Sequence, residues 1–259
     1  MDRGELPVIP LKTEWYASTD LGVVREVNED RYFASDDLGL WLVADGMGGM
    51  ARGDWAANAV SEAMSVVQRQ ETLPAMIEAA AGALRDANDR ILAESAARSA
   101  QMGTTAVVLV VRGRDFGMLW VGDSRGYLIR DRKLHRLTRD HSQVQEMVDR
   151  GLIDDAAAAV HPMRNVLTRA VGVGTPLMVD SIADTLRPDD LLLLCSDGLY
   201  GVIGEEELEA ILVREPVDRA GEILIRRCHE LGAPDNITLI AVVAAEATLV
   251  RLGATELLI

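Results

Sequence analysis

Four aspartates stand at the ends of apolar runs in this sequence. Asp45, Asp123 and Asp197 each follow such a run, and Asp235 precedes one. Short runs rich in Val and Leu predict buried strands, so these carboxylates are expected at strand ends, where a lone charge is costly to desolvate. If the four converge, two like charges about 4 Å apart repel by roughly 4 kcal/mol at an effective dielectric near 20. Hard divalent cations with oxygen ligands are the usual compensation; the alternative is that the four acids point to unrelated places.

A second charged stretch lies upstream, where Arg25 precedes Glu29 and Asp30. One interpretation is a solvated charged turn, which is the ordinary outcome for an isolated arginine. Beside a metal cluster, however, the planar guanidinium fork matches a phosphate with two parallel hydrogen bonds. Glu29 and Asp30 would then accept hydrogen bonds from metal-bound waters.

The composition excludes some functions. The chain has 259 residues, of which 49% are hydrophobic, enough for one large domain or two small ones. The net charge of -15 argues against nucleic-acid binding, and an anionic substrate would need a local positive focus such as a metal cluster. The two cysteines, Cys195 and Cys228, form no CxxC motif and are predicted to be reduced core thiols of a cytoplasmic protein. Residues 1–12 lack the apolar region of a signal peptide and no run is long enough to span a bilayer, so we expect no membrane insertion.

The elements that must position these residues include a set of short strands. The apolar pattern predicts them over residues 14–20, 31–36, 40–44, 104–111, 116–121, 127–130, 133–137, 179–185, 191–195 and 236–244. Tight turns between the strands of 104–137 favour an antiparallel meander. Residues 140–174 are polar, with Ser142 capping a helix to Arg150 and a second helix over 155–160, which is typical of a lid or recognition loop.

Helices are predicted in two pairs. Asp54 is expected to cap a helix over 55–70, and Pro74 opens a second helix to about Ala97. The other pair covers 205–213 and 217–231, and the tail 246–259 receives no role. The order of strands and helix pairs does not alternate as in a parallel α/β fold. It favours antiparallel sheets covered by helix pairs, an α+β layered sandwich.

Six motifs occur in the order of one known family. They are Arg25-x-x-Asn28-Glu29-Asp30, Val43-Ala44-Asp45-Gly46-Met47-Gly48-Gly49, Gly103-Thr104-Thr105, Val121-Gly122-Asp123-Ser124-Arg125, Ser196-Asp197-Gly198 and Asp235-Asn236. With them the chain resembles the metal-dependent serine/threonine protein phosphatases (PPM, type 2C) in the bacterial single-domain form, from about residue 14 to 245. Each motif alone is common, but six in order at sensible spacing are specific.

The resemblance implies a four-layer α-β-β-α sandwich with two Mn²⁺ or Mg²⁺ ions in the cleft at the sheet ends. By position, Asp45 would bridge both metals, the Gly46 carbonyl would bind one, and Asp197 and Asp235 would complete the other. A third metal would use Asp123 together with Asp197. The resemblance further implies that Asp30, with Glu29, acts through waters, that Arg25 holds the substrate phosphate, and that residues 140–174 form the family's flap.

The implied activity is hydrolysis of phosphoserine and phosphothreonine in proteins by a metal-activated water, with no covalent phosphoenzyme. Phosphorylated proteins and a cognate Ser/Thr kinase are the implied partners, and residues 1–259 are expected to form one catalytic domain. Eukaryotic relatives carry a histidine where this chain has Met47, so a metal-bound water is the expected proton donor, with His141 and His161 as weaker candidates.

Three other interpretations compete with this one. A non-catalytic module that binds phosphoproteins would be expected to have lost a metal-binding acid, and the chain retains all four. The chain could instead be another two-metal hydrolase, such as a nuclease or a small-molecule phosphatase. The net negative charge disfavours a nuclease, and the small-molecule phosphatase stays open. A nucleotide-phosphate cradle at residues 46–49 lacks the Gly-Lys-Ser/Thr of a P-loop.

Overall fold

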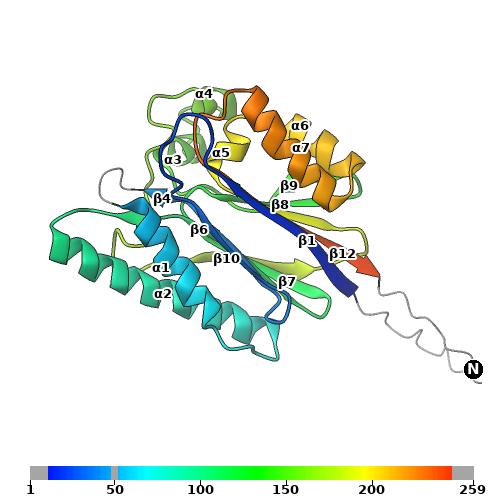
Figure 1. Ribbon diagram of the computed structural model, residues 1–259, viewed down its shortest axis with the longest axis horizontal. Helices are drawn as coiled ribbons and strands as arrows, with labels where there is room; N and C mark the ends of the chain where they lie inside the picture. The colour runs from blue at the N-terminus through cyan, green and yellow to red at the C-terminus, as the bar shows by residue number, and fades with distance from the viewer. Residues whose placement is uncertain (1–10, 48–51, 247–259) are drawn as a thin grey trace, which may run out of the picture.

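The computed structural model describes residues 11–47 and 52–246. Two five-stranded antiparallel sheets stack face to face, and helices cover both outer faces (Figure 1). The predicted α+β sandwich of antiparallel sheets and helix pairs is therefore confirmed. Residues 48–51 of the glycine motif and the tail from residue 247 onward lie outside the described residues.

The strand order explains how distant segments meet. One sheet has the order β1-β12-β11-β8-β9, with bounds Leu11–Asp20, Ile237–Glu246, Leu191–Cys195, Arg125–Arg130 and Lys133–Arg136. The other has the order β10-β7-β6-β3-β2, with bounds Asp180–Thr185, Asp115–Val121, Ala106–Arg112, Leu40–Ala44 and Arg31–Ser35. The short pair β4 (Gly46–Met47) and β5 (Gly103–Thr104) was not predicted.

The predicted meander over residues 104–137 is wrong. β6 and β7 pair in one sheet, whereas β8 and β9 pair in the other, so the chain changes sheet between Val121 and Arg125. β10 and β11 likewise belong to different sheets. The central strands are buried on both faces, and such apolar runs carry no periodicity that could assign them to a sheet. The change of sheet places Asp123 at the ends of both sheets.

The helices cover the sheets in pairs (Figure 1). α1 (Gly53–Ser65) and α2 (Leu73–Arg98) lie on one side, and α6 (Glu205–Arg214) and α7 (Val217–Glu230) lie on the other. The expected cap and length of the first helix were wrong: Asp54 lies within its first turn, the N-cap is Arg52 without a side-chain hydrogen bond, and the helix ends at Ser65. α2 has proline in its first turn, as predicted, and its cap, Thr72, was not predicted. A single turn, α5 (Asp197–Tyr200), was missed.

The polar excursion forms a separate layer at one end of the sandwich. It contains α3 (Gln143–Asp149), capped by Ser142 as predicted, and α4 (Asp155–Ala159), capped by Asp154. Its far end is anchored to α2, because the buried Asn88 accepts a hydrogen bond from the Gly172 amide and donates one to the Gly174 carbonyl. The excursion is therefore tied to the body of the protein at its C-terminal end.

Three apolar clusters hold these layers together. One lies between the two sheets, and the other two lie between each sheet and its helices. Trp41 and Met118 belong to the central cluster and are fully buried. Cys195 and Cys228 are buried free thiols of the cluster beneath α6 and α7. In the described part of the chain, no helix has the length and apolar character needed to cross a bilayer.

Candidate metal centre

The backbone of Asp45 is held by a pair of threonines. Asp45 follows β3, and its amide donates to Thr105 Oγ1 at 3.0 Å while its carbonyl accepts from the Thr105 amide at 2.8 Å and from Thr104 Oγ1 at 2.9 Å. The Thr105 hydroxyl also lies 2.6 Å from the Ser124 hydroxyl, next to Asp123. These hydrogen bonds hold the Asp45 backbone in place, and none of them brings a positive charge to its carboxylate.

Asp197 and Asp123 meet Asp45 from the other strands. Asp197 begins α5, which Ser196 separates from β11, and its carboxylate is within hydrogen-bonding reach of Asp45. Burial, followed by the charge of Asp235, raises the pKa of Asp197 to about 6. Burial, followed by the charge of Asp197, raises the pKa of Asp123 to about 8. For Asp45, burial and then the charges of Asp30 and the other three acids raise the pKa well above its ordinary value.

Asp30 is the most deeply buried of the remaining acids in this group. It is 1% exposed and accepts a hydrogen bond from Ser196 Oγ at 2.8 Å. Burial raises the pKa of Asp30 to about 6, although the hydrogen bonds from Ser196 and Thr238 oppose the shift. Asp30 is thus a buried carboxylate that interacts electrostatically with Asp197 and Asp235.

Asp235 and Arg25 contact each other at the exposed edge of the group. Arg25 Nη2 lies 2.8 Å from Asp235 Oδ2, and their side chains are 51% and 35% exposed. The hydrogen bond with Asp235 raises the pKa of Arg25, and the charges of Glu29 and Asp197 add to this effect. The arginine that was expected to hold a phosphate therefore pairs with a carboxylate that was expected to hold a metal.

Gly46 and Glu29 join this site to helix α1. A Cβ on Gly46 would lie 2.3 Å from the Gly53 carbonyl oxygen and 2.6 Å from that of Glu29, so only glycine fits. Glu29 Oε1 accepts from the Gly53 amide at 2.9 Å, at the start of α1. A carboxylate from another segment thus stabilises this helix N-terminus, which explains why the helix needs no cap of its own.

The donor set suits a hard cation. Asp30, Asp45, Asp123, Asp197 and Asp235 interact electrostatically as one group, and all their ligand atoms are oxygens. Such acids stay ionised together at neutral pH only with positive compensation, and Ca²⁺, Mg²⁺ and Mn²⁺ prefer oxygen ligands. Within residues 11–47 and 52–246, no three His, Cys, Asp or Glu side chains are already arranged as a metal site. The pairing of Asp235 with Arg25 is consistent with this finding.

The histidines take structural positions. His141 is buried and stacks on Trp120; its Nδ1 accepts from the Gly122 amide at 3.1 Å, and its Nε2 lies 3.2 Å from Asp180 Oδ2. Burial, followed by the charge of Arg169, lowers the pKa of His141, so the neutral ring positions the turn before Asp123. His161 accepts from the Met163 amide in the excursion.

Sequence reasoning gave no role to Asn236, which is a central residue of this site. Its Oδ1 accepts from the Glu29 amide at 2.8 Å, and its Nδ2 donates to the carbonyls of Leu21 at 2.9 Å and Val27 at 3.1 Å. Asn236 is 5% exposed and follows Asp235 directly. The position of Asn236 next to Asp235 in the last motif was the one signal that could have indicated its importance. Its hydrogen-bond partners lie more than two hundred residues earlier in the chain, so its role could not be derived from its neighbours.

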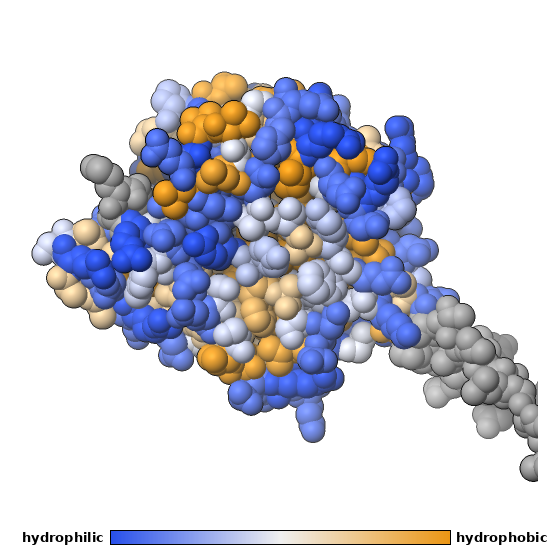
Figure 2. Space-filling view, in the orientation of Figure 1, coloured by the Kyte–Doolittle hydropathy of each residue, from blue (hydrophilic) through white to orange (hydrophobic). Residues whose placement is uncertain are grey.

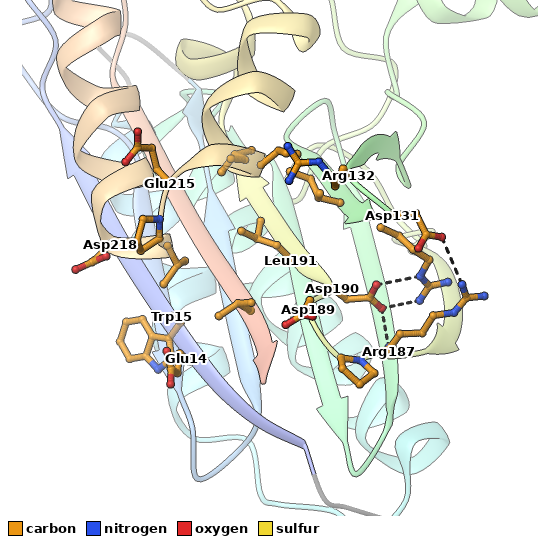
Figure 3. A pocket seen from close by; sticks show the side chains of 18 residues that line it. Glu14, Trp15, Asp131, Arg132, Arg187, Asp189, Asp190, Leu191, Glu215 and Asp218 are labelled. Atoms are coloured by element: carbon orange, nitrogen blue, oxygen red, sulfur yellow. Dashed lines mark hydrogen bonds and ion pairs between the residues drawn. The ribbon is translucent and has the colours of Figure 1, made fainter. Parts of the chain in front are cut away.

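Two cavities differ in character. One of about 530 Å³ adjoins the carboxylates and is lined by Asp123, Asp197 and Tyr200 together with α3 and α4. The other, of about 810 Å³, lies at the opposite end of β11 (Figure 3). There Asp190 faces Arg130 at 2.7 Å and Asp131 faces Arg187 at 3.7 Å. Four of the charges that line the second cavity are thus paired with one another, whereas Asp123 and Asp197, which line the first, are buried acids with raised pKa values.

Comparisons with known proteins identify the family of this chain. The family model described as protein phosphatase 2C matches residues 23–233. The serine/threonine phosphatase stp of Listeria welshimeri is 36% identical over 234 residues, covering 86% of this chain and 93% of the Listeria protein. The structure of PppA, a regulatory component of T6SS in Pseudomonas aeruginosa, has a TM-score of 0.85 and 37% identity, over 91% of this chain and 99% of that one. The catalytic domain of the phosphatase PstP in complex with two manganese ions has a TM-score of 0.82 and 31% identity, over 92% and 100%. The chain therefore belongs to the protein phosphatase 2C family.

Proposed function

We propose that this protein is a metal-dependent protein serine/threonine phosphatase that hydrolyses phosphoserine and phosphothreonine. The observation that carries the proposal is the group of five buried or partly buried aspartates with Arg25 at its exposed edge. Relatives named serine/threonine phosphatases, and PstP with its two manganese ions, support the same reaction. Two Mn²⁺ or Mg²⁺ ions are the proposed cofactors, and a third is proposed beside Asp123.

The proposed ligands are Asp45 and the Gly46 carbonyl for one metal, and Asp45, Asp197 and Asp235 for the other. Asp123 with Asp197 would hold the third, and Asp30 would act through waters. When bound, the ions would supply the positive charge that activates a water and stabilises the oxyanions of phosphoryl transfer. The all-oxygen donor set and the raised carboxyl pKa values fit these ions.

The protein's own residues then have distinct roles. Arg25 would exchange its contact with Asp235 for the substrate phosphate, which its planar fork can bind with two parallel hydrogen bonds. The release of Asp235 would leave that carboxylate available to a metal. Thr105, Ser196 and Asn236 would keep the carboxylates and their loops in place during turnover.

The wider biological setting is also a proposal. We place residues 14–245 in a single catalytic domain, with residues 140–174 as its flap. Phosphorylated proteins would be the substrates and a Ser/Thr kinase the opposing enzyme. A cytoplasmic location would agree with the two free buried thiols.

Hydrolysis of a phosphothreonine peptide tests the proposal. Purified protein is treated with chelator and assayed before and after addition of Mn²⁺, Mg²⁺ or Zn²⁺, with Asp197→Asn as the inactive variant. We expect phosphate release that depends on Mn²⁺ or Mg²⁺ and is lost in the variant. Hydrolysis of p-nitrophenyl phosphate without hydrolysis of the peptide would instead indicate a small-molecule phosphatase. Peptide binding without any hydrolysis would indicate a binding module.

A further inference from the structure

The loop between β1 and β2 exposes an unusual number of aliphatic side chains. Within residues 21–27, which we call the Arg25 loop, Val23, Val24 and Val27 are 63%, 66% and 57% exposed, and Leu21 is 40% exposed. Figure 2 shows hydrophobic side chains gathered near the upper edge of the view, where Figure 1 draws this loop. Clustered exposed aliphatic side chains, in contrast to scattered ones, indicate an interaction surface.

The Arg25 loop is held in one conformation. Asn236 Nδ2 donates to the Leu21 and Val27 carbonyls, so a single side chain ties both ends of the loop. The Val23 amide donates to the Ala233 carbonyl at 2.9 Å. Gly22 has a φ of +75°, and a Cβ there would lie 2.2 Å from the Asp235 carbonyl oxygen. The valines are therefore presented outward by an ordered backbone.

The valines of the loop lie on either side of Arg25, the residue that we propose binds the substrate phosphate. Arg25 lies in the middle of the loop and contacts Asp235, at the edge of the carboxylate group. A phosphorylated side chain bound by Arg25 would bring the residues before and after it over the same loop, because neighbouring residues of a chain are only about 3.8 Å apart. The exposed valines would then meet the side chains that flank the phosphorylated residue.

We propose that the Arg25 loop is a docking surface for aliphatic residues that flank the phosphorylated residue of the substrate; this inference rests on the proposed phosphatase function. Continuity with Arg25 identifies the occupant as the substrate polypeptide. Glu26 is exposed beside Arg25 and would repel acidic flanking residues. The favoured substrates are thus phosphopeptides with Val, Leu or Ile, and without Asp or Glu, next to the phosphorylated position.

A double-mutant cycle tests this inference. The variant V24T/V27T keeps side-chain shape and replaces one methyl by a hydroxyl at each site. Wild type and variant are assayed with Mn²⁺ on two phosphothreonine peptides that differ only in leucine or serine flanks, and on p-nitrophenyl phosphate. Since burying one methyl-sized group is worth about fourfold in affinity, we expect kcat/KM for the leucine peptide to fall about threefold to tenfold. Rates on the serine peptide and on p-nitrophenyl phosphate should change less than twofold.

The matched control is Val66→Thr, because Val66 is 71% exposed just beyond the end of α1. It should leave all three rates unchanged, and thermal melts should show all variants folded. Equal losses on both peptides, or no loss on either, would overturn the docking surface while leaving the phosphatase function intact. Loss of a dimer in V24T/V27T, measured by analytical ultracentrifugation, would also overturn it by assigning the loop to self-association. Absence of metal-dependent hydrolysis of either peptide by wild type would overturn the proposed function, and this inference with it.

Discussion

Replacing Asp30 by asparagine should stabilise the metal-free protein. Asp30 is 1% exposed, and burial raises its pKa from the ordinary 3.8 to about 6. Asparagine has nearly the same shape, and its carbonyl oxygen can still accept the hydrogen bond from Ser196 Oγ. The substitution therefore removes a buried charge and keeps its principal contact.

The magnitude follows from the pKa shift of Asp30. A shift of about two units corresponds to about 3 kcal/mol, since each unit is worth 1.36 kcal/mol. Because the pKa is higher in the folded state, the folded state binds more protons, and wild-type stability falls as pH rises from about 4 through about 6. The advantage of Asp30→Asn in chelator should thus be about 3 kcal/mol at pH 8 and about half of that at pH 5.

Thermal unfolding followed by circular dichroism measures this effect. In chelator at pH 8, Asp30→Asn should melt about 6–12 °C above wild type, because 1 kcal/mol corresponds to about 2–4 °C in a domain of this size. Asp86→Asn is the matched control, since Asp86 is exposed on α2 and its charge change is the same. Saturating Mn²⁺ should stabilise wild type and so reduce the advantage of the variant. A variant that melts at or below wild type in chelator at pH 8 would refute the argument that Asp30 is a destabilising buried charge.

Three further predictions concern activity and the scaffold of the site. Asp197→Asn should lower kcat by at least about a hundredfold while circular dichroism shows an intact fold; near wild-type turnover at saturating Mn²⁺ would remove Asp197 from the metal assignment. Arg25→Ala should raise KM for phosphopeptides about tenfold while Mn²⁺ still binds, and Arg25→Lys should restore only part of the loss; an unchanged KM would argue against phosphate contact. Asn236→Ala should lower the free energy of unfolding by about 2–3 kcal/mol in urea titrations, because it leaves the Glu29 amide and two loop carbonyls without their partner; a loss below 1 kcal/mol would contradict the role of Asn236 in holding the loop.

The sequence was most informative where a local pattern decides the structure. Asp45 and Asp197 each follow an apolar run, and this pattern predicted that both lie at strand ends. The two strands, β3 and β11, have the predicted bounds. Pro74 and Ser142 marked helix starts correctly, because capping depends on a few neighbouring residues. The layered α+β class followed from the order of elements. These inferences all rest on interactions within about one turn or one strand.

The failures share a dependence on distant partners. The start of α1 could not be predicted, because its stabilising carboxylate comes from Glu29, in a separate segment. The pair of Arg25 with Asp235 joins residues 210 positions apart, so their motifs indicated a role for each residue but not their contact. Strands buried on both faces look alike in sequence, which is why β7 and β8 were placed in one sheet. One-turn α5 is too short to show a helical period.

The groups that hold the carboxylates position them without supplying a positive charge. Thr105, Ser196 and Asn236 position the acidic residues or their loops through neutral hydrogen bonds. A cationic partner at these positions would compensate the carboxylates permanently and compete with a divalent cation, whereas a neutral donor positions a carboxylate without such competition. Arg125 lies nearby, but its guanidinium is hydrogen-bonded to Asp140. Arg25 contacts the group only at its exposed edge, where we propose that a phosphate replaces Asp235 as its partner. The arrangement that makes the metal-free site costly therefore supports the proposal that this site binds a divalent cation.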